Sequence, residues 1–247
     1  MSGHSKWATI KHAKGAADAK RGKIFTKLIK EISIAARMGG GNPDSNPRLR
    51  TAILKARSSN MPKDNIDRAI KKGTGELEGV NYEELIYEAY ASGGVAVFIE
   101  VLTDNKNRAA AEIRNILTKA GGQLATSGSV SRLFKRMGVI TLDGEKYTED
   151  QVMEAALDGG AEDVSASSGI VEVTCAPEDF ENVMNALGAK NFETMSASIN
   201  MVAETETTLD NDATAKVLKL IDRLEENEDV QNVYTNINIP ENYEGDV

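Results

Sequence analysis

The spacing of apolar residues changes once along the chain, near Gly73, and this change limits the folds that the chain can adopt. Before Gly73 the apolar residues recur three and four positions apart, which is the period of an amphipathic helix. From about Leu85 onward they form short runs and alternating stretches, which are typical of strands, separated by helical segments. We therefore predict a mixed α+β protein in which a basic helical bundle precedes two α/β domains.

Three helices are expected in the first part of the chain. Apolar residues at helical spacing predict the first over residues 23–37. Asn46 followed by Pro47 has the form of an N-cap with proline at the first helical position, and opens the second helix. The third is expected over 62–73. Residues 2–21 have no sustained apolar stripe, so we interpret them as a basic arm that precedes the bundle.

Six elements in the middle of the chain follow the order strand, helix, strand, strand, helix, strand. They are expected near residues 139–142, 148–158, 164–166, 170–175, 177–187 and 195–201. Thr148 and Gln151 form a capping box for the first of these helices, and Pro177 is expected to open the second. This order predicts the split βαβ plan of a ferredoxin-like domain.

The segments on either side of these six elements are incomplete when taken alone. Strand and helix patterns over 82–134 form an unfinished α/β unit, and only a helix near 213–226 and a strand near 233–239 follow the ferredoxin-like part. One helix and one strand are too few for a stable domain, so the two incomplete units are expected to join, with the ferredoxin-like domain inserted between them. The predicted domains are 1–80, 81–136 together with 204–247, and 137–203.

Charge is distributed very unevenly along the chain. The formal net charge is -9, yet residues 1–73 hold 17 Lys and Arg against 5 Asp and Glu, a net of +12. Residues 74–247 hold 12 Lys and Arg against 33 Asp and Glu, a net of -21. Such an asymmetry is typical of a basic module that faces nucleic acid and is joined to an acidic body. The acidic part keeps the protein soluble, offers a platform for a basic partner, or guides orientation on the nucleic acid, and the sequence leaves these interpretations open.

Signatures of catalysis are scarce. Residues 73–75, Gly-Thr-Gly, resemble the start of a phosphate loop but lack the Gly-Lys-Ser/Thr that would follow. Cys175, the single cysteine, lies on the apolar side of a predicted strand, as a core residue would. His4 and His12 are the only histidines and have no cysteine or suitably spaced carboxylate to complete a zinc site. We expect no enzymatic activity, cofactor or metal, and keep as an alternative an enzyme that uses an acidic cleft between the later domains.

The cellular location follows from what the sequence lacks. One cysteine cannot form an internal disulfide, and no apolar run approaches the roughly 18 residues of a membrane span. The basic N-terminus is followed by no apolar segment of the kind that a signal peptide needs. A cytoplasmic protein without a membrane partner is expected, and its oligomeric state is left open.

The candidate binding residues are the cations of the basic module and one aromatic residue. Lysine and arginine side chains hold a phosphate backbone by releasing its counterions, and a tryptophan can stack on a base. The alternative is a basic segment that is only solvated and binds nothing. The continued positive charge on the third helix, at Lys63, Arg68, Lys71 and Lys72, weighs against this alternative. The residues predicted to contact nucleic acid are Lys6, Trp7, Lys11, Lys14, Lys20, Arg21, Lys23, Lys27, Lys30, Arg48, Arg50, Lys55 and Arg57.

Several ordered blocks resemble one protein family, the YebC/PmpR family, over almost the whole chain. The N-terminal signature consists of residues 3–7 (Gly-His-Ser-Lys-Trp), Ile10, Lys14, Asp18, Arg21 and residues 25–28 (Phe-Thr-Lys-Leu). The later blocks are residues 60–66 (Asn-Met-Pro-Lys-Asp-Asn-Ile), 87–90 (Tyr-Glu-Ala-Tyr), 103–108 (Thr-Asp-Asn-Lys-Asn-Arg) and 128–130 (Gly-Ser-Val).

This resemblance implies a fold and a function. It implies three domains, with the first helical and the third inserted in the second, and a non-enzymatic cytoplasmic protein described as a probable transcriptional regulator that binds DNA. It also implies an alternative, because members of the family are associated with the ribosome and with translation of proline-rich stretches. Both functions need cations that hold phosphates, so the residues do not choose between DNA and ribosomal RNA.

Overall fold

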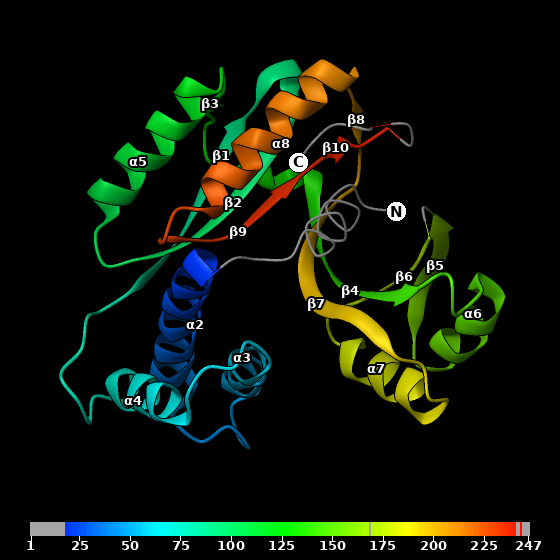
Figure 1. Cartoon of the computed structure of the whole chain (residues 1–247), viewed down its shortest axis with the longest axis horizontal. Helices are drawn as coiled ribbons and strands as arrows, with labels where there is room; N and C mark the ends of the chain where they lie inside the picture. Colours follow the sequence, from blue (N-terminus) through cyan, green and yellow to red (C-terminus); the bar gives the residue numbers. More distant parts are fainter. Residues whose placement is uncertain (1–17, 168, 241–242, 244–247) are drawn as a thin grey trace.

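The computed structural model describes residues 18–167, 169–240 and 243, whose helices and strands form a helical bundle and two main sheets (Figure 1). The α-helices are α2 (Asp18–Gly39), α3 (Pro47–Ser58), α4 (Lys63–Thr74), α5 (Lys106–Lys119), α6 (Glu149–Asp158), α7 (Phe180–Ala189) and α8 (Asn211–Glu225). The strands are β1 (Glu83–Tyr90), β2 (Ala96–Thr103), β3 (Gln123–Leu124), β4 (Phe134–Asp143), β5 (Ala161–Ser167), β6 (Ile170–Cys175), β7 (Thr194–Ala203), β8 (Thr207–Thr208), β9 (Val230–Thr235) and β10 (Ile237–Asn238). Two short 3-10 helices are η1 (Ser92–Gly94) and η2 (Ser131–Leu133). The mixed α+β prediction, with helices first and sheets after, is confirmed.

The helical bundle consists of α2, α3 and α4, whose apolar faces meet in a shared core. Ile32 of α2, Leu49 of α3 and Ile66 of α4 are among its buried residues. Asn46 caps α3 as predicted, because its side-chain oxygen accepts a hydrogen bond from the Leu49 N–H. Its amide group also donates to the Ala35 carbonyl at 2.8 Å, so one buried side chain fixes the turn between α2 and α3.

Gly73 has a packing role in this bundle. A Cβ atom at this position would lie 2.3 Å from the backbone oxygen of Ser33 in α2, closer than non-bonded atoms approach. Gly73 and Thr74 form the last turn of α4. The glycine therefore permits α2 and α4 to pack closely. Residues 73–75 resemble the start of a phosphate loop because helix packing and the end of α4 require glycines there.

The first sheet has the strand order β3-β1-β2-β9, and its three paired strand contacts are antiparallel. Helices α5 and α8 cover one face (Figure 1), where Ile99, Ile113 and Ile221 belong to one buried core. On the opposite face Phe98 packs with Phe134 and Tyr234, with ring centroids 6.0 and 6.3 Å from that of Phe98. Strand β2 is buried on both faces apart from Glu100, as its apolar sequence predicts.

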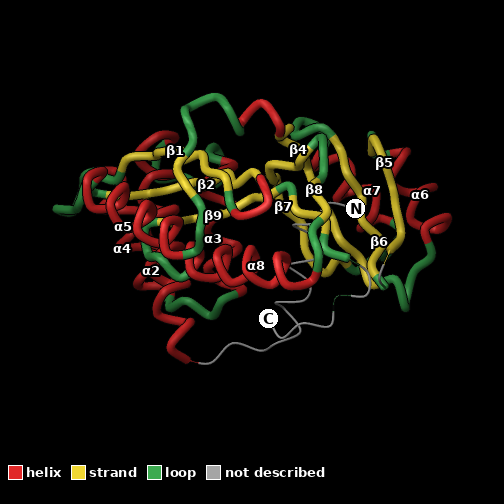
Figure 2. The backbone as a smooth tube through the Cα atoms, turned by 90° about the horizontal axis from the view of Figure 1, so that it is seen from above, coloured by secondary structure: helices red, strands yellow, loops and turns green. Residues whose placement is uncertain are grey.

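The second sheet has the order β5-β6-β4-β7, with all neighbours antiparallel. Helices α6 and α7 pack on one of its faces, and Figure 2 shows this sheet beside the first one. The predicted order of six elements is confirmed, as is the capping box of Thr148 and Gln151. The chain leaves the first sheet after β3, builds the second sheet, and returns to the first as β9.

Some element boundaries differ from the prediction. Helix α7 begins at Phe180 rather than at Pro177, because residues 176–179 form a turn in which the Asp179 N–H donates to the Ala176 carbonyl. Strand β4 begins at Phe134, five residues before the predicted start, because Lys135 and Arg136 interrupt the apolar pattern without interrupting the pairing with β7.

The prediction also misses the division of the last strand. Residues 233–239 were expected to form one strand, but β9 pairs with β2 and β10 pairs with β8 in a separate small parallel sheet. Strands β3 and β8, two residues each, are too short for a periodic pattern to reveal them. Among residues 18–167, 169–240 and 243, none of the helices combines the length and the apolarity that a bilayer span requires.

Candidate nucleic-acid interface

The thirteen residues predicted to contact nucleic acid fall into three groups in the structure. Lys6, Trp7, Lys11 and Lys14 lie outside the described residues. Lys20 and Arg21 belong to the start of α2, whose backbone is described there. The other seven lie on α2 and α3, and their side chains differ sharply in exposure and partners.

Lys30 departs most clearly from the predicted nucleic-acid contacts on α2. Its side chain is buried, with 7% of the residue exposed. The Nζ atom donates to Asp229 Oδ1 at 2.6 Å and to the Glu228 carbonyl at 2.9 Å. A phosphate could reach Lys30 only by leaving the buried Asp229 carboxylate without this partner, so the geometry favours a structural role for Lys30 over the predicted contact.

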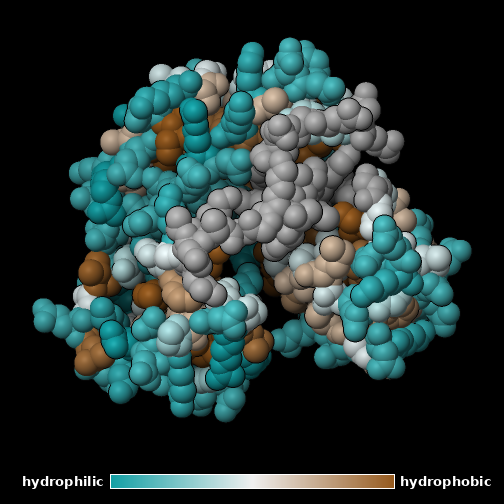
Figure 3. Space-filling model, in the orientation of Figure 1, coloured by the Kyte–Doolittle hydropathy of each residue, from teal (hydrophilic) through white to brown (hydrophobic). Residues whose placement is uncertain are grey.

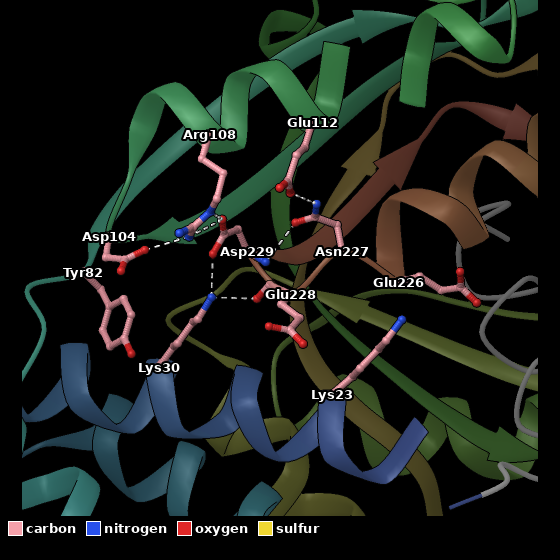
Figure 4. Close-up of a pocket in the computed structure, with 10 residues that line it drawn as sticks. All are labelled: Lys23, Lys30, Tyr82, Asp104, Arg108, Glu112, Glu226, Asn227, Glu228 and Asp229. Carbon is pink, nitrogen blue, oxygen red and sulfur yellow. Dashed lines mark hydrogen bonds and ion pairs between the residues drawn. The ribbon is translucent and has the colours of Figure 1, made fainter. Parts of the chain in front are cut away.

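Asp229 is the centre of this junction, as Figure 4 shows. Its second oxygen, Oδ2, accepts from Arg108 Nη2 at 2.9 Å and from the Thr103 hydroxyl at 3.1 Å. Burial acts to raise the pKa of Asp229, but the hydrogen bonds and charges of Lys30 and Arg108 outweigh it and hold that pKa below its ordinary value. The network joins α2 of the bundle to β2, α5 and β9 of the first sheet.

Lys27 strengthens the same junction, whereas Lys23 stays exposed. Lys27 Nζ donates to the Glu225 carbonyl at 2.6 Å, at the C-terminal end of α8, where a cation is favourable for the helix dipole. Lys23 lines a cavity of about 590 Å³ between α2 and the α8-β9 turn, together with Glu226 (Figure 4). Of the predicted contacts Lys20, Lys23, Lys27 and Lys30 on α2, the structure thus places Lys30 in a buried pair and Lys27 in a half-buried contact.

The cavity at this junction has the wrong charge for a phosphate. Its lining includes three cations and five carboxylates, and these are Lys23, Lys30, Arg108, Asp104, Glu112, Glu226, Glu228 and Asp229. An anionic ligand would meet an excess of negative charge there. Within the part of the chain that the structure describes, no group of three or more His, Cys, Asp or Glu side chains is arranged to hold a metal ion.

Arg48 and Arg50 of α3 also contact the rest of the protein. Arg48 makes two hydrogen bonds to Glu31 of α2, at 2.7 and 3.1 Å, and a third to Glu84 of β1. The Glu31 hydrogen bond is the main reason why the pKa of Arg48 is raised. Arg50 donates to the Pro43 carbonyl and lies 3.5 Å from a carboxylate oxygen of Glu181 in α7. Arg48 therefore ties α3 to the first sheet.

Exposed cations remain at the end of α3 and along α4. Lys55 and Arg57, both predicted, are exposed. Five further exposed cations were not among the predicted contacts, namely Arg37, Lys63, Arg68, Lys71 and Lys72. Among the described residues, none of these seven side chains has an ion pair. Four of the five lie on α4, the predicted third helix. The positive charge of that helix in the sequence could have identified them as candidate contacts.

A second buried carboxylate gives the block at residues 128–130 a structural role. Glu88 of β1 accepts hydrogen bonds from the backbone N–H groups of Gly128, Val130 and Ser131, at 2.7, 2.5 and 3.0 Å. Burial acts to raise the pKa of Glu88, but these hydrogen bonds lower it below the ordinary value. The carboxylate thus fixes the loop that leads into η2.

Cys175 and the exposed apolar residues have ordinary structural explanations. Cys175 is fully buried in the core between the second sheet and its helices, and burial raises the pKa of its thiol, as expected for a core residue. Figure 3 shows hydrophilic residues over most of the face that it presents, with small separate hydrophobic areas on the bundle. Exposed apolar side chains such as Met38 and Leu54 are common on soluble domains and need no partner.

Comparisons with known proteins agree with the architecture. The chain is 65% identical over 244 residues to a "Probable transcriptional regulatory protein" of Treponema denticola, with 99% of each chain covered. A protein of the same name from Trichlorobacter lovleyi is 56% identical, over 97% of this chain and 96% of the relative. The crystal structure of a conserved hypothetical protein, Aq1575, from Aquifex aeolicus has a TM-score of 0.83 and 46% identity, covering 93% of this chain and 95% of that one.

The family assignment covers both the bundle and the sheets. Residues 5–76 match the family described as "TACO1/YebC protein N-terminal domain", and residues 82–237 match "TACO1/YebC second and third domain". The chain therefore belongs to the TACO1/YebC family, as the resemblance of its sequence blocks implied.

Proposed function

We propose that this protein is a non-enzymatic regulator that binds the phosphate backbone of nucleic acid through exposed cations of its helical bundle. The observation that carries the proposal is the group of eight exposed cations, Lys23 and the seven named above, that have no ion pair with another described residue of the chain. The names of its relatives support a role in transcription and hence DNA as the target. We interpret the ion network that lines the cavity at the junction as structural.

The proposed contact surface combines predicted and newly recognised residues. Lys55, Arg57 and Lys63 flank the turn between α3 and α4, and Arg68 lies farther along α4. Each cation that neutralises a phosphate releases a counterion, and this release supplies binding that is independent of base sequence. Lys6, Trp7, Lys11, Lys14, Lys20, Arg21 and Lys23 are retained as proposed contacts from the sequence, whereas Lys27, Lys30, Arg48 and Arg50 hold the bundle in place.

The remaining chain consists of two proposed domains, of which the inserted one is proposed to orient the nucleic acid by repulsion. We divide it into the domain 81–136 with 204–247 and an inserted ferredoxin-like domain, 137–203, and the return of the chain to the first sheet as β9 supports this division. Residues 137–203 hold 13 Asp and Glu and only two lysines. Both lysines are paired with glutamates, Lys146 with Glu193 and Lys190 with Glu154. This domain repels phosphates and directs them to the bundle.

The binding test removes three charges from the proposed surface. The variant Lys55→Gln, Arg57→Gln, Lys63→Gln is expected to bind 20-base-pair duplexes of unrelated sequence more weakly by a similar factor. The slope of log affinity against log salt concentration should become less steep by about 2.7, because each lost phosphate contact removes about 0.9. Fluorescence anisotropy at several salt concentrations measures both quantities.

A matched control removes three exposed cations that lie on α8, outside the helical bundle. The variant Lys216→Gln, Lys219→Gln, Arg223→Gln changes the exposed side of α8 and should leave the slope unchanged. Equal losses in both triple variants, or none in the first, would overturn the proposed surface. Crosslinking in cells followed by sequencing tests the target, because promoter DNA supports a transcriptional regulator and ribosomal RNA supports the translation factor instead.

A further inference from the structure

A second basic segment lies inside the part of the chain that is acidic on average. Residues 105–142 contain seven lysines and arginines and a single acidic residue, Glu112. The cations are Lys106, Arg108, Arg114, Lys119, Arg132, Lys135 and Arg136. The segment has a net charge of +6. It is not apparent from the net charge of -21 for residues 74–247, because the acidic residues on either side outweigh it.

Three of these seven cations are engaged within the protein. Lys106 pairs with Glu83, Arg108 pairs with Asp104 and Asp229, and Lys135 lies 3.4 Å from Glu162. Arg132 and Arg136 are exposed, and neither has an ion pair with another described residue. These two arginines therefore retain their full charge for an external anion.

The loop beside Arg132 is held in one conformation by Glu88. The three backbone N–H groups that donate to this buried carboxylate come from residues 128–131, directly before Arg132. The Nε atom of Arg132 in turn donates to the Ser129 carbonyl at 3.3 Å, which orients the guanidinium. A rigid loop loses little conformational entropy when its arginine binds a ligand, so this position is suited to contact a phosphate.

The loop and the helical bundle lie on the same face of β1. Leu85, Tyr87 and Ala89 point toward the core under α5 and α8, so Glu84, Ile86 and Glu88 point to the other side. Glu84 receives Arg48 of α3, and Glu88 receives the loop. These two anchors are four residues apart, which is about 13 Å along a strand. Ile86 stands between them with 60% of its surface exposed, so the strand surface between the two anchors is open.

Arg136 borders the same face of the sheet. It follows Phe134 by two residues on β4, and Phe134 packs on Phe98 of β2 on the side away from α5 and α8. Burial and the Glu100 carboxylate raise the pKa of Tyr234, and the Arg136 guanidinium opposes that rise, which indicates that Arg136 is close to Tyr234. Arg132 and Arg136 thus lie on the side of the first sheet on which the bundle is anchored.

We propose that Arg132 and Arg136 form a second phosphate-contacting surface, so that a nucleic-acid backbone held by the bundle also crosses the exposed part of β1 and reaches the Glu88-anchored loop. This inference rests on the proposed function and adds a second point of attachment to it. The ligand class is a phosphodiester backbone, which DNA and RNA share. A single strand bends more easily than a duplex, whose persistence length is about 150 base pairs, so single strands should reach both surfaces more readily and gain more from the second one.

The test uses the full chain and the double variant Arg132→Gln, Arg136→Gln. For a 20-nucleotide single-stranded RNA or DNA, the expected result is an affinity about tenfold lower at 0.1 M salt. The slope of log affinity against log salt should become less steep by about 1.4, or 0.7 for each lost phosphate contact. A 20-base-pair duplex serves as the second ligand, and a smaller loss is expected for it. The variant Lys216→Gln, Lys219→Gln removes the same charge from α8 and should leave both quantities unchanged.

The outcomes separate this inference from the function on which it rests. If the bundle variant Lys55→Gln, Arg57→Gln, Lys63→Gln loses affinity and the arginine variant binds like the unmodified protein, the second surface is refuted and the proposed function stands. If the unmodified protein binds neither single strands nor duplexes, both are refuted. Equal losses in the arginine and α8 variants would assign the effect to net charge and refute the specific surface. Thermal melting of each variant checks the fold, and unchanged melting temperatures are expected for these exposed substitutions.

Discussion

Two buried carboxylates hold separate segments on the first sheet, and they do so by different chemistry. Asp229 receives charged side chains, Lys30 from the bundle and Arg108 from α5. Glu88 receives three backbone N–H groups from the loop at 128–131. Both carboxylates therefore stay ionised in the folded protein, with pKa values below the ordinary ones.

The difference between them decides where positive charge stays exposed. At Asp229 the ionised carboxylate pairs with Lys30, a lysine that the sequence predicts as a contact to nucleic acid. At Glu88 the carboxylate is satisfied by backbone groups, so Arg132 and Arg136 beside the loop need no internal partner. A count of charges along the chain thus overestimates the binding surface where a cation pairs with a buried carboxylate. It underestimates that surface where backbone N–H groups satisfy the carboxylate and the neighbouring cations stay exposed.

The largest expected effect tests the Asp229 junction. Replacing Lys30 with alanine leaves the buried Asp229 carboxylate with only Arg108 and Thr103 as side-chain partners. Breaking a buried ion pair in this way lowers the unfolding free energy by about 3–5 kcal/mol. Urea unfolding followed by circular dichroism measures the loss. Lys23→Ala removes an exposed lysine from the same helix and should change the stability by less than about 0.5 kcal/mol. Similar values for the two variants would remove the distinction between structural and exposed lysines.

A smaller effect is expected at the Glu88 anchor. Glu88→Gln replaces one acceptor oxygen by an NH₂ group that faces N–H donors, and unsatisfied buried donors cost about 1–3 kcal/mol. Hydrogen exchange at the amides of Gly128, Val130 and Ser131 should become faster. The control Glu83→Gln lies on the same strand as Glu88 and breaks an exposed ion pair with Lys106 of α5. It should lower the unfolding free energy by less than about 1 kcal/mol. Unchanged exchange in the Glu88 variant would show that the loop is held by something else.

The smallest effect concerns pH. The folded pKa of Glu88 lies below its ordinary value of 4.5, so its contribution is complete above that value and is lost as pH falls through the folded pKa. The stability difference between the unmodified protein and Glu88→Gln should therefore be full at pH 6 and shrink below pH 4.5. A protonated carboxyl still accepts some of the hydrogen bonds, so the change should be smaller than the substitution effect. Unfolding at several pH values measures it, and a constant difference down to pH 3 would contradict the lowered pKa.

Much of the fold followed from local patterns. The helices carry periodic apolar faces and caps that act within a few residues, such as Asn46 and the pair Thr148 and Gln151. The order of the six middle elements followed from the same signals. Boundaries failed where pairing continued through polar residues, as in Lys135 and Arg136 of β4, because strand pairing uses the backbone and tolerates polar side chains at an exposed position.

The sequence by itself determined the helix and strand segments, the positive charge of the first part and the family. Periodicity, capping and composition are local or additive properties, so they can be read along the chain. Only the tertiary structure decided which cations face solvent, because Lys30 meets its carboxylate 199 residues away and Arg108 meets the same one across 121 residues. Ion pairing depends on distance and burial in space, and charge composition carries neither.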